Sequence, residues 1–232
     1  MNPFDHSILA FLNSFAHRST TFDVLVGYLA NSELPKGDIV MGVFCWAWFR
    51  SRGPGSKDRT ALAVTLVGAI VAIIVGRSLS LLLPFRMRPF ENSAFDFIIP
   101  YGPQPGLLRG WSSFPSDHAM LFFELAIGML YVSRAAGLLL LAHAVLVVSL
   151  PRIYLGLHYP TDILGGALIG ALTALAMNRT RLREWAARPL LRFHETRRAL
   201  FYGAMFIVAS QIASMFWDLR ALTQILMKAV RH

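Results

Sequence analysis

The sequence has little charge and almost no cysteine. Of its 232 residues, only 15% are charged and 55% are hydrophobic, and Cys45 is the one cysteine. A single cysteine excludes both an intrachain disulfide and a cluster of thiolate ligands for a metal. So few charges, together with a positive mean hydropathy, are unusual for a soluble domain. We therefore expect a membrane-embedded protein.

The chain also lacks linkers, repeats and an obvious targeting signal. No Gly/Ser-rich or Pro-rich stretch divides it, so we expect one domain over residues 1–232. Its start lacks the basic and apolar regions of a cleaved signal peptide. Acidic residues number 13 against 22 Lys and Arg, for a net charge of +9. Because the basic excess lies between apolar runs, the positive-inside rule explains it and no nucleic-acid partner is expected.

Apolar stretches predict an all-α membrane bundle. A membrane-spanning helix needs about 20 apolar residues, and five stretches approach this: 59–83, 116–133, 135–151, 160–178 and 199–218. Segment 20–49 is apolar at both ends but is interrupted between Asn31 and Asp38, which predicts one broken span or, alternatively, two short helices. Residues 6–17 and 220–232 resemble amphipathic surface helices. The prediction is about six spans preceded by an interfacial helix.

The basic loops predict which way the bundle faces. Lys and Arg crowd loops 50–59 and 179–198, which we expect on the cytoplasmic side. With about six spans, the loops 84–115 and 151–159 then lie together on the outer side. These outer loops still contain arginines, which oppose the orientation bias and therefore need another explanation: Arg86, Arg88, Arg109 and Arg152.

Three short polar segments at span ends suggest that explanation. They are Arg88-Pro89, the stretch from Phe114 to His118, and the stretch from Arg152 to Asp162. Ser116 follows a proline and precedes an apolar run, which predicts a helix N-cap whose free backbone N–H groups attract phosphate. Pro160 suits the first position of the next helix, so His158 lies just outside that helix and Asp162 in its first turn.

These residue types supply the parts needed for phosphoryl transfer. A carboxylate-backed histidine is an activated nucleophile, which predicts that His158 attacks phosphorus and that Asp162 orients it. His118 is then the acid that protonates the leaving oxygen and later activates water. Arg88, Arg152 and Ser116 are predicted to hold the phosphate oxygens, because a guanidinium donates paired hydrogen bonds and keeps its charge. No metal or other cofactor is required.

The three segments together resemble the type-2 phosphatidic acid phosphatases, whose site also occurs in vanadium haloperoxidases and bacterial acid phosphatases. The family pattern is K-x6-R-P, P-S-G-H and S-R-x5-H-x3-D. This chain matches it in order and spacing at these positions: Arg88, Pro89, Pro115, Ser116, His118, Arg152, His158 and Asp162. The resemblance covers roughly residues 60–178 and implies the same roles for the matched residues.

The chain departs from the family pattern at three positions. Leu81 stands where the family has lysine, Asp117 replaces the glycine, and Pro151 replaces the serine. Three residues could supply the missing charge, namely Arg86, Arg77 and Lys36, of which Arg77 is favoured. Asp117 is placed in the phosphate site or, alternatively, serves only the helix N-terminus.

Two further predictions concern packing. Arg77 could instead pair with Glu33 or Asp38, since charged groups inside spans tend to neutralise one another. Gly166 and Gly170 form a small-xxx-small face that predicts close helix packing.

The branch that the motifs resemble most contains the bacterial undecaprenyl-diphosphate phosphatases. The resemblance implies a multi-pass protein of the bacterial inner membrane, with membrane lipids around it and its site on the outer side. Undecaprenyl diphosphate is the expected substrate. Phosphatidic acid, phosphatidylglycerophosphate and lipid A phosphate are the alternatives, with a phosphotransferase or a non-catalytic lipid-phosphate binder or transporter as further possibilities. The oligomeric state is not predicted.

Overall fold

The computed structural model describes residues 2–51, 56–102 and 111–217. Every regular element within these ranges is a helix, which confirms the predicted all-α class. Arg109 and the predicted tail helix 220–232 lie outside the described residues.

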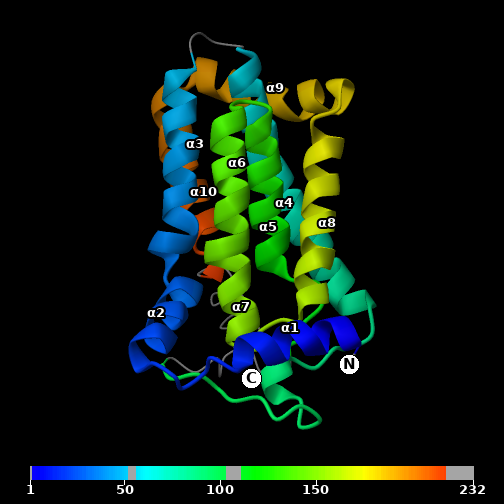
Figure 1. The fold of residues 1–232 in the computed structure, drawn as a ribbon. Coiled ribbons are helices and arrows are strands. Elements are labelled where there is room, and N and C mark those ends of the chain that lie inside the picture. Colours follow the sequence, from blue (N-terminus) through cyan, green and yellow to red (C-terminus); the bar gives the residue numbers. More distant parts are fainter. Residues whose placement is uncertain (1, 52–55, 103–110, 218–232) are drawn as a thin grey trace, which may run out of the picture.

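Helix α5 (Asp117–Leu130) is the centre of the bundle (Figure 1). It packs against α4 (Lys57–Leu82), α6 (Arg134–His143) and, most extensively, α8 (Pro160–Met177). Because neighbours cover it on several sides, α5 is apolar almost all round and has no single apolar stripe. Its one buried acid, Glu124, has no exposed surface.

Glycines allow α5 and α8 to approach each other closely. A Cβ atom at Gly166 would overlap the backbone oxygen of Ser116, and one at Gly170 would overlap the backbone oxygen of Met120. This confirms the predicted close packing at both glycines. The contact holds the N-terminal ends of the two helices together.

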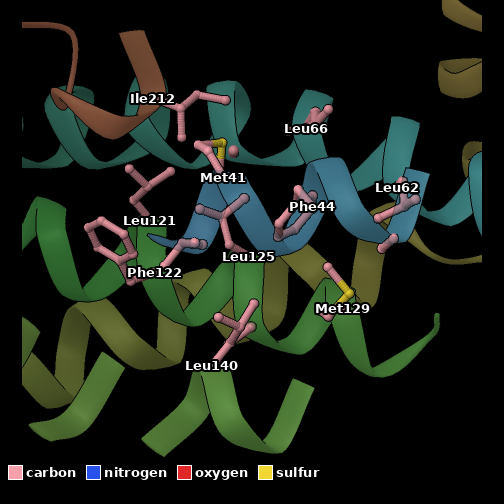
Figure 2. Packing of buried hydrophobic residues seen from close by; sticks show 14 of the residues in the cluster. Met41, Phe44, Leu62, Leu66, Leu121, Phe122, Leu125, Met129, Leu140 and Ile212 are labelled. Carbon is pink, nitrogen blue, oxygen red and sulfur yellow. The ribbon is translucent and has the colours of Figure 1, made fainter. Parts of the chain in front are cut away.

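The hydrophobic core extends from α5 to α3, α4, α6 and α10. Figure 2 shows its side chains interdigitating between these helices. The labelled members are Met41, Phe44, Leu62, Leu66, Leu121, Phe122, Leu125, Met129, Leu140 and Ile212. Helix α3 (Ile39–Arg50) and helix α10 (Arg198–Ala213) thus complete the bundle on the side away from α8.

The segment 20–49 is broken where the sequence predicted. Helix α2 (Thr20–Asn31) ends at the extended residue Ser32, and a turn of π-helix, η1 (Leu34–Asp38), leads into α3. The Pro35 carbonyl oxygen lies 2.7 Å from His143 Nε2, and because a carbonyl can only accept, Nε2 is the donor. Gly37 packs so closely on the Ala213 backbone that a Cβ would not fit. The break is therefore held by its neighbours.

The number of spans is not confirmed. Three of the described helical segments are long and apolar enough to cross a membrane: Lys57–Leu82, Arg134–Tyr154 and Pro160–Met177. The second of these runs from α6 through η4 (Ala144–Ser149) to α7 (Leu150–Tyr154). Helix α5 has 14 residues and so extends only about 21 Å. It starts at the predicted Ser116 cap but is shorter than the predicted stretch 116–133, because the chain turns after Leu130. Helix α10, at 16 residues, is also shorter than the predicted segment 199–218.

Surface helices cover both ends of the bundle (Figure 1). Helix α1 (Pro3–Asn13), the predicted interfacial helix, crosses one end. Helix α9 (Thr180–Thr196) crosses the other end, where α3 ends and α4 begins. The sequence predicted a loop for this basic region, whereas it forms a helix that buries Ala186 and Ala187. Most of its arginines are exposed, and the half-buried Arg183 donates to the Lys57 oxygen at 2.6 Å. Both basic segments therefore lie at one end, as the predicted orientation requires.

The α5–α8 contact predicts a different response at two helical glycines. Gly170→Ala should lower the free energy of unfolding by about 1–3 kcal/mol, because its methyl group overlaps the Met120 backbone. Gly203→Ala is the matched control, since no atom lies within 4 Å of the added Cβ and alanine favours a helix. Thermal unfolding in detergent micelles measures both. Equal stability of the two variants would contradict the packing described.

Candidate active site

The three polar segments meet at the end of the bundle that α1 covers. Backbone hydrogen bonds join them: Ser113 N donates to the Arg86 oxygen at 2.8 Å, and Ser116 N donates to the Asp162 oxygen at 3.2 Å. A third bond joins Phe90 N to the Gly156 oxygen at 3.1 Å. Residues from three separate parts of the sequence are thereby fixed relative to one another.

Helix α5 begins at this junction with the predicted cap. Ser116 is buried and extended, and its Oγ lies 3.5 Å from the backbone nitrogen of Ala119. Asp117 and His118 consequently lie in the first turn. The free N–H groups of this turn form the positive end of the helix dipole, which favours an anion at this position.

His158 lies just before α8 and is almost completely buried, with 6% of its surface exposed. Its Nδ1 is 2.8 Å from the carbonyl oxygen of Ser113. Since a carbonyl only accepts hydrogen bonds, this contact assigns the proton of the neutral ring to Nδ1. Nε2 then keeps its lone pair, and it lies 3.5 Å from Nη1 of Arg88. The arrangement presents a nucleophilic nitrogen beside a guanidinium.

Burial lowers the pKa of His158 below its usual value. The nearby charges of Arg88 and Arg152 lower the pKa further, while Asp162 opposes them. The imidazole is therefore neutral at neutral pH, which is the form that can attack phosphorus.

Asp162 supports His158 less directly than the sequence predicted. Its Oδ2 accepts a hydrogen bond from the backbone nitrogen of Tyr159 at 2.8 Å, and its Oδ1 accepts from Arg86. The distance from Oδ2 to Nδ1 of His158 is 3.7 Å, which is an electrostatic contact longer than a hydrogen bond. The Ser113 carbonyl holds the ring instead, because the carboxylate is already engaged by the helix start and by Arg86.

Arginines supply the positive charge next to His158. Arg88 is buried, and its Nη1 donates to the Leu157 oxygen at 2.6 Å. Its Nε has no hydrogen-bond partner within the described ranges, and burial lowers its pKa. Arg152 is also buried, and its Nη1 donates to the Ala30 oxygen at 3.0 Å. Each guanidinium therefore keeps further N–H groups for a ligand.

The remaining two predicted phosphate-site residues bind each other. Arg77 Nη2 lies 2.6 Å from the Asp117 carboxylate, and the guanidinium also lies over the Trp111 ring. The predicted pairing of Arg77 with Glu33 or Asp38 is therefore wrong. Asp117 is the partner because it begins α5 next to the end of α4 that carries Arg77. Leu81, at the position of the family lysine, is 85% exposed.

Sequence analysis missed Asp5, which is fully buried on α1. Its carboxylate accepts hydrogen bonds from the backbone nitrogen of Thr161 at 2.9 Å and from the Thr161 hydroxyl at 2.7 Å. It also forms an ion pair with Arg86 at 2.7 Å, and Arg86 in turn contacts Asp162. The only signal was an acidic residue at the start of an otherwise apolar amphipathic segment. Arg86, noted as an unexplained outer arginine, thus connects α1 to α8.

No group of three or more His, Cys, Asp or Glu side chains that could hold a metal ion occurs in the part of the chain that the structure describes.

Comparison with known proteins identifies the family. Residues 59–186, more than half of the chain, match the model of the PAP2 superfamily, and the chain belongs to this superfamily. Its motifs and relatives place it close to the undecaprenyl-diphosphate phosphatase branch. The apolar helices, together with the relatives described below, indicate that the chain is a membrane protein.

Two relatives and one solved structure illustrate the similarity. Bacitracin transport permease protein BcrC of Bacillus licheniformis is 32% identical over 52% of this chain, and the match spans 55% of that protein's length. Undecaprenyl-diphosphatase BcrC of Bacillus subtilis is 23% identical over 72% of this chain and 79% of that protein. The structure also resembles the crystal structure of Aquifex aeolicus LpxE, with a TM-score of 0.54 and 22% sequence identity. The similar region includes 76% of this chain and 98% of the LpxE chain, and it supports the fold alone.

The contacts of Asp5 predict that α1 stabilises the site. Asp5→Asn removes the charge that pairs with Arg86 and weakens the bonds to Thr161. We expect the free energy of unfolding to fall by about 1–3 kcal/mol, toward the lower end because Arg86 is partly exposed. Asp96→Asn, at an exposed position, is the matched control. Thermal unfolding of both variants tests this, and an unchanged Asp5→Asn variant would show that α1 does not hold the site.

Proposed function

We propose that the protein is a metal-independent membrane lipid phosphatase that hydrolyses undecaprenyl diphosphate to undecaprenyl phosphate. The observation that carries this proposal is that Nε2 of His158 is unprotonated and lies 3.5 Å from Nη1 of Arg88. A phosphate held by Arg88 places its phosphorus within reach of that nitrogen. Membership of the PAP2 superfamily and the name of the Bacillus subtilis relative support the substrate.

In the first step, Nε2 of His158 attacks the terminal phosphorus. A bond forms between Nε2 and phosphorus while the bond from phosphorus to the bridging oxygen breaks. His118 gives its proton to that oxygen, which leaves as the lipid monophosphate. The Ser113 carbonyl and Asp162 stabilise the positive charge that develops on the His158 ring. The product of this step is a phosphohistidine.

In the second step, water replaces the histidine. His118, now neutral, takes a proton from the water as its oxygen attacks phosphorus. The bond between Nε2 and phosphorus breaks, inorganic phosphate leaves, and His158 returns to its starting form. Throughout, Arg88, Arg152, Ser116 and the first turn of α5 hold the equatorial oxygens, where negative charge concentrates. The Arg77–Asp117 pair borders this pocket.

The same proposal includes an orientation in the bacterial inner membrane. The basic end of the bundle, with α9, faces the cytoplasm, and the α1 end with the site faces outward. In this arrangement α2 with α3, together with α4, α5, the α6–α7 segment, α8 and α10, make up about six crossings. The lipid tail stays in the bilayer while its phosphate enters the site.

Other substrates and other activities are compatible with parts of this mechanism. Phosphatidic acid, phosphatidylglycerophosphate and lipid A phosphate present a similar phosphate, and a phosphotransferase would replace water by another acceptor. A transport role has one supporting observation, which is the name of the Bacillus licheniformis relative, a bacitracin transport permease protein. Binding alone would require the arginines, but it would not require an unprotonated histidine nitrogen next to Arg88.

Phosphate release tests the proposal. We expect the purified protein to release inorganic phosphate from undecaprenyl diphosphate more efficiently than from phosphatidic acid, with and without EDTA. His158→Ala should lower the rate by at least about 10³-fold, because it removes the nucleophile. His6→Ala, at an exposed position, is the matched control and should keep the wild-type rate.

Each contrary outcome identifies a different error. Release that stops in EDTA would contradict the metal-independent mechanism, and full activity of His158→Ala would contradict the nucleophile. A preference for phosphatidic acid would change the substrate. No release from any lipid phosphate, with lipid binding retained, would favour the transport reading.

A further inference from the structure

Lys36 is a buried cation that the proposed mechanism does not use. It lies in η1, at the break between α2 and α3, and only 6% of its surface is exposed. It makes neither a hydrogen bond nor an ion pair with any residue in 2–51, 56–102 or 111–217. Glu33 and Asp38 are close enough to act on its charge, yet neither forms an ion pair with it. An unpaired buried charge is costly, so this position suggests an anionic ligand.

The structure around the break keeps Lys36 inside the bundle. His143 holds the preceding residue through the Pro35 carbonyl, and Gly37 lies directly on the Ala213 backbone. The backbone on both sides of Lys36 is therefore fixed, and its side chain is buried. Interrupted helices at membrane depth commonly line a polar cavity or a ligand site.

Lys36 also lies within electrostatic range of one arginine of the site, Arg152. Arg152 donates a hydrogen bond to the Ala30 oxygen, near the end of α2 and six residues before Lys36. The positive charges of Arg152 and Lys36 act directly on each other, as do those of Arg152 and Arg88. Buried cations thus extend from Arg88, beside the neutral His158, to Arg152 and on to Lys36.

The other two cations considered for this role have partners. Arg77 is paired with Asp117, and Arg86 is paired with Asp5 and Asp162. Among the described residues, Lys36 is the one of the three that forms no ion pair with a carboxylate, although Glu33 and Asp38 lie close enough to act on its charge. It can therefore supply the positive charge that Leu81 does not.

We propose that Lys36 binds the second phosphate of a diphosphate substrate, the one bonded to the lipid. This assignment rests on the proposed function, because it takes the terminal phosphate to lie at His158 and Arg88. The lipid-linked phosphate then lies farther into the bundle, beside Arg152 and Lys36. It gains negative charge when the bridging bond breaks, and a fixed ammonium group stabilises that charge. A monophosphate substrate has no group that reaches Lys36.

The test compares farnesyl diphosphate with farnesyl monophosphate. Lys36→Met should lower kcat/KM for the diphosphate by about 10-fold to 100-fold, as expected for a lost hydrogen bond between charged groups. Hydrolysis of the monophosphate should change by less than about 2-fold. Lys57→Met, an exposed lysine at the opposite end of the bundle, is the matched control and should change neither rate.

Thermal stability separates this role from a structural one. Lys36→Met removes an unpaired buried charge and should not lower the melting temperature. The non-hydrolysable farnesyl methylenediphosphonate should stabilise the wild-type protein and Lys57→Met but not Lys36→Met. Equal losses of rate for both substrates, an unchanged diphosphate rate, or stabilisation of Lys36→Met by the diphosphonate would each overturn the assignment. If the wild type hydrolyses neither substrate but shows Lys36-dependent stabilisation, the hydrolytic function fails while the binding assignment stands.

Discussion

The close contact between α5 and α8 is the constraint on which the site depends. Gly166 and Gly170 let the backbones of the two helices touch, and this brings Ser116 within hydrogen-bonding distance of the Asp162 carbonyl. The N-cap of one helix and the histidine before the other are thereby fixed on the same side of the bundle. Because helix N-termini favour anions, the packing that builds the core also creates the position for a phosphate.

Charge is distributed so that only some cations remain available. Carboxylates on α1, α5 and α8 neutralise the arginines at the margin of the site, as Asp5 and Asp162 do for Arg86 and Asp117 does for Arg77. Arg88 and Arg152 donate to backbone carbonyls and form no ion pair with a carboxylate among the described residues, so their charges remain for a ligand. This division separates residues that hold the structure from those that bind substrate.

Local signals made much of the site predictable. The cap at Ser116, the start of α8 at Pro160 and the break near Pro35 follow from the conformational limits of the residues themselves. Their positions could therefore be read from the sequence. Contacts between segments that are distant in the sequence could not be predicted in this way. The buried role of Asp5 depends on how α1 docks, and the partner of Arg77 depends on the position of α5 relative to α4. The short length of α5 was also missed, because a helix enclosed by protein need not match the thickness of the bilayer.

The identity of the nucleophile is the central claim, and trapping the intermediate tests it most directly. During turnover the wild-type protein should carry a phosphoryl group on its nucleophile, whereas His158→Ala should carry none. After brief reaction with undecaprenyl diphosphate labelled at the terminal phosphate and an alkaline quench, peptide mapping should find the label on His158. Label on any other residue, or single-turnover phosphate release without labelled protein, would contradict the account.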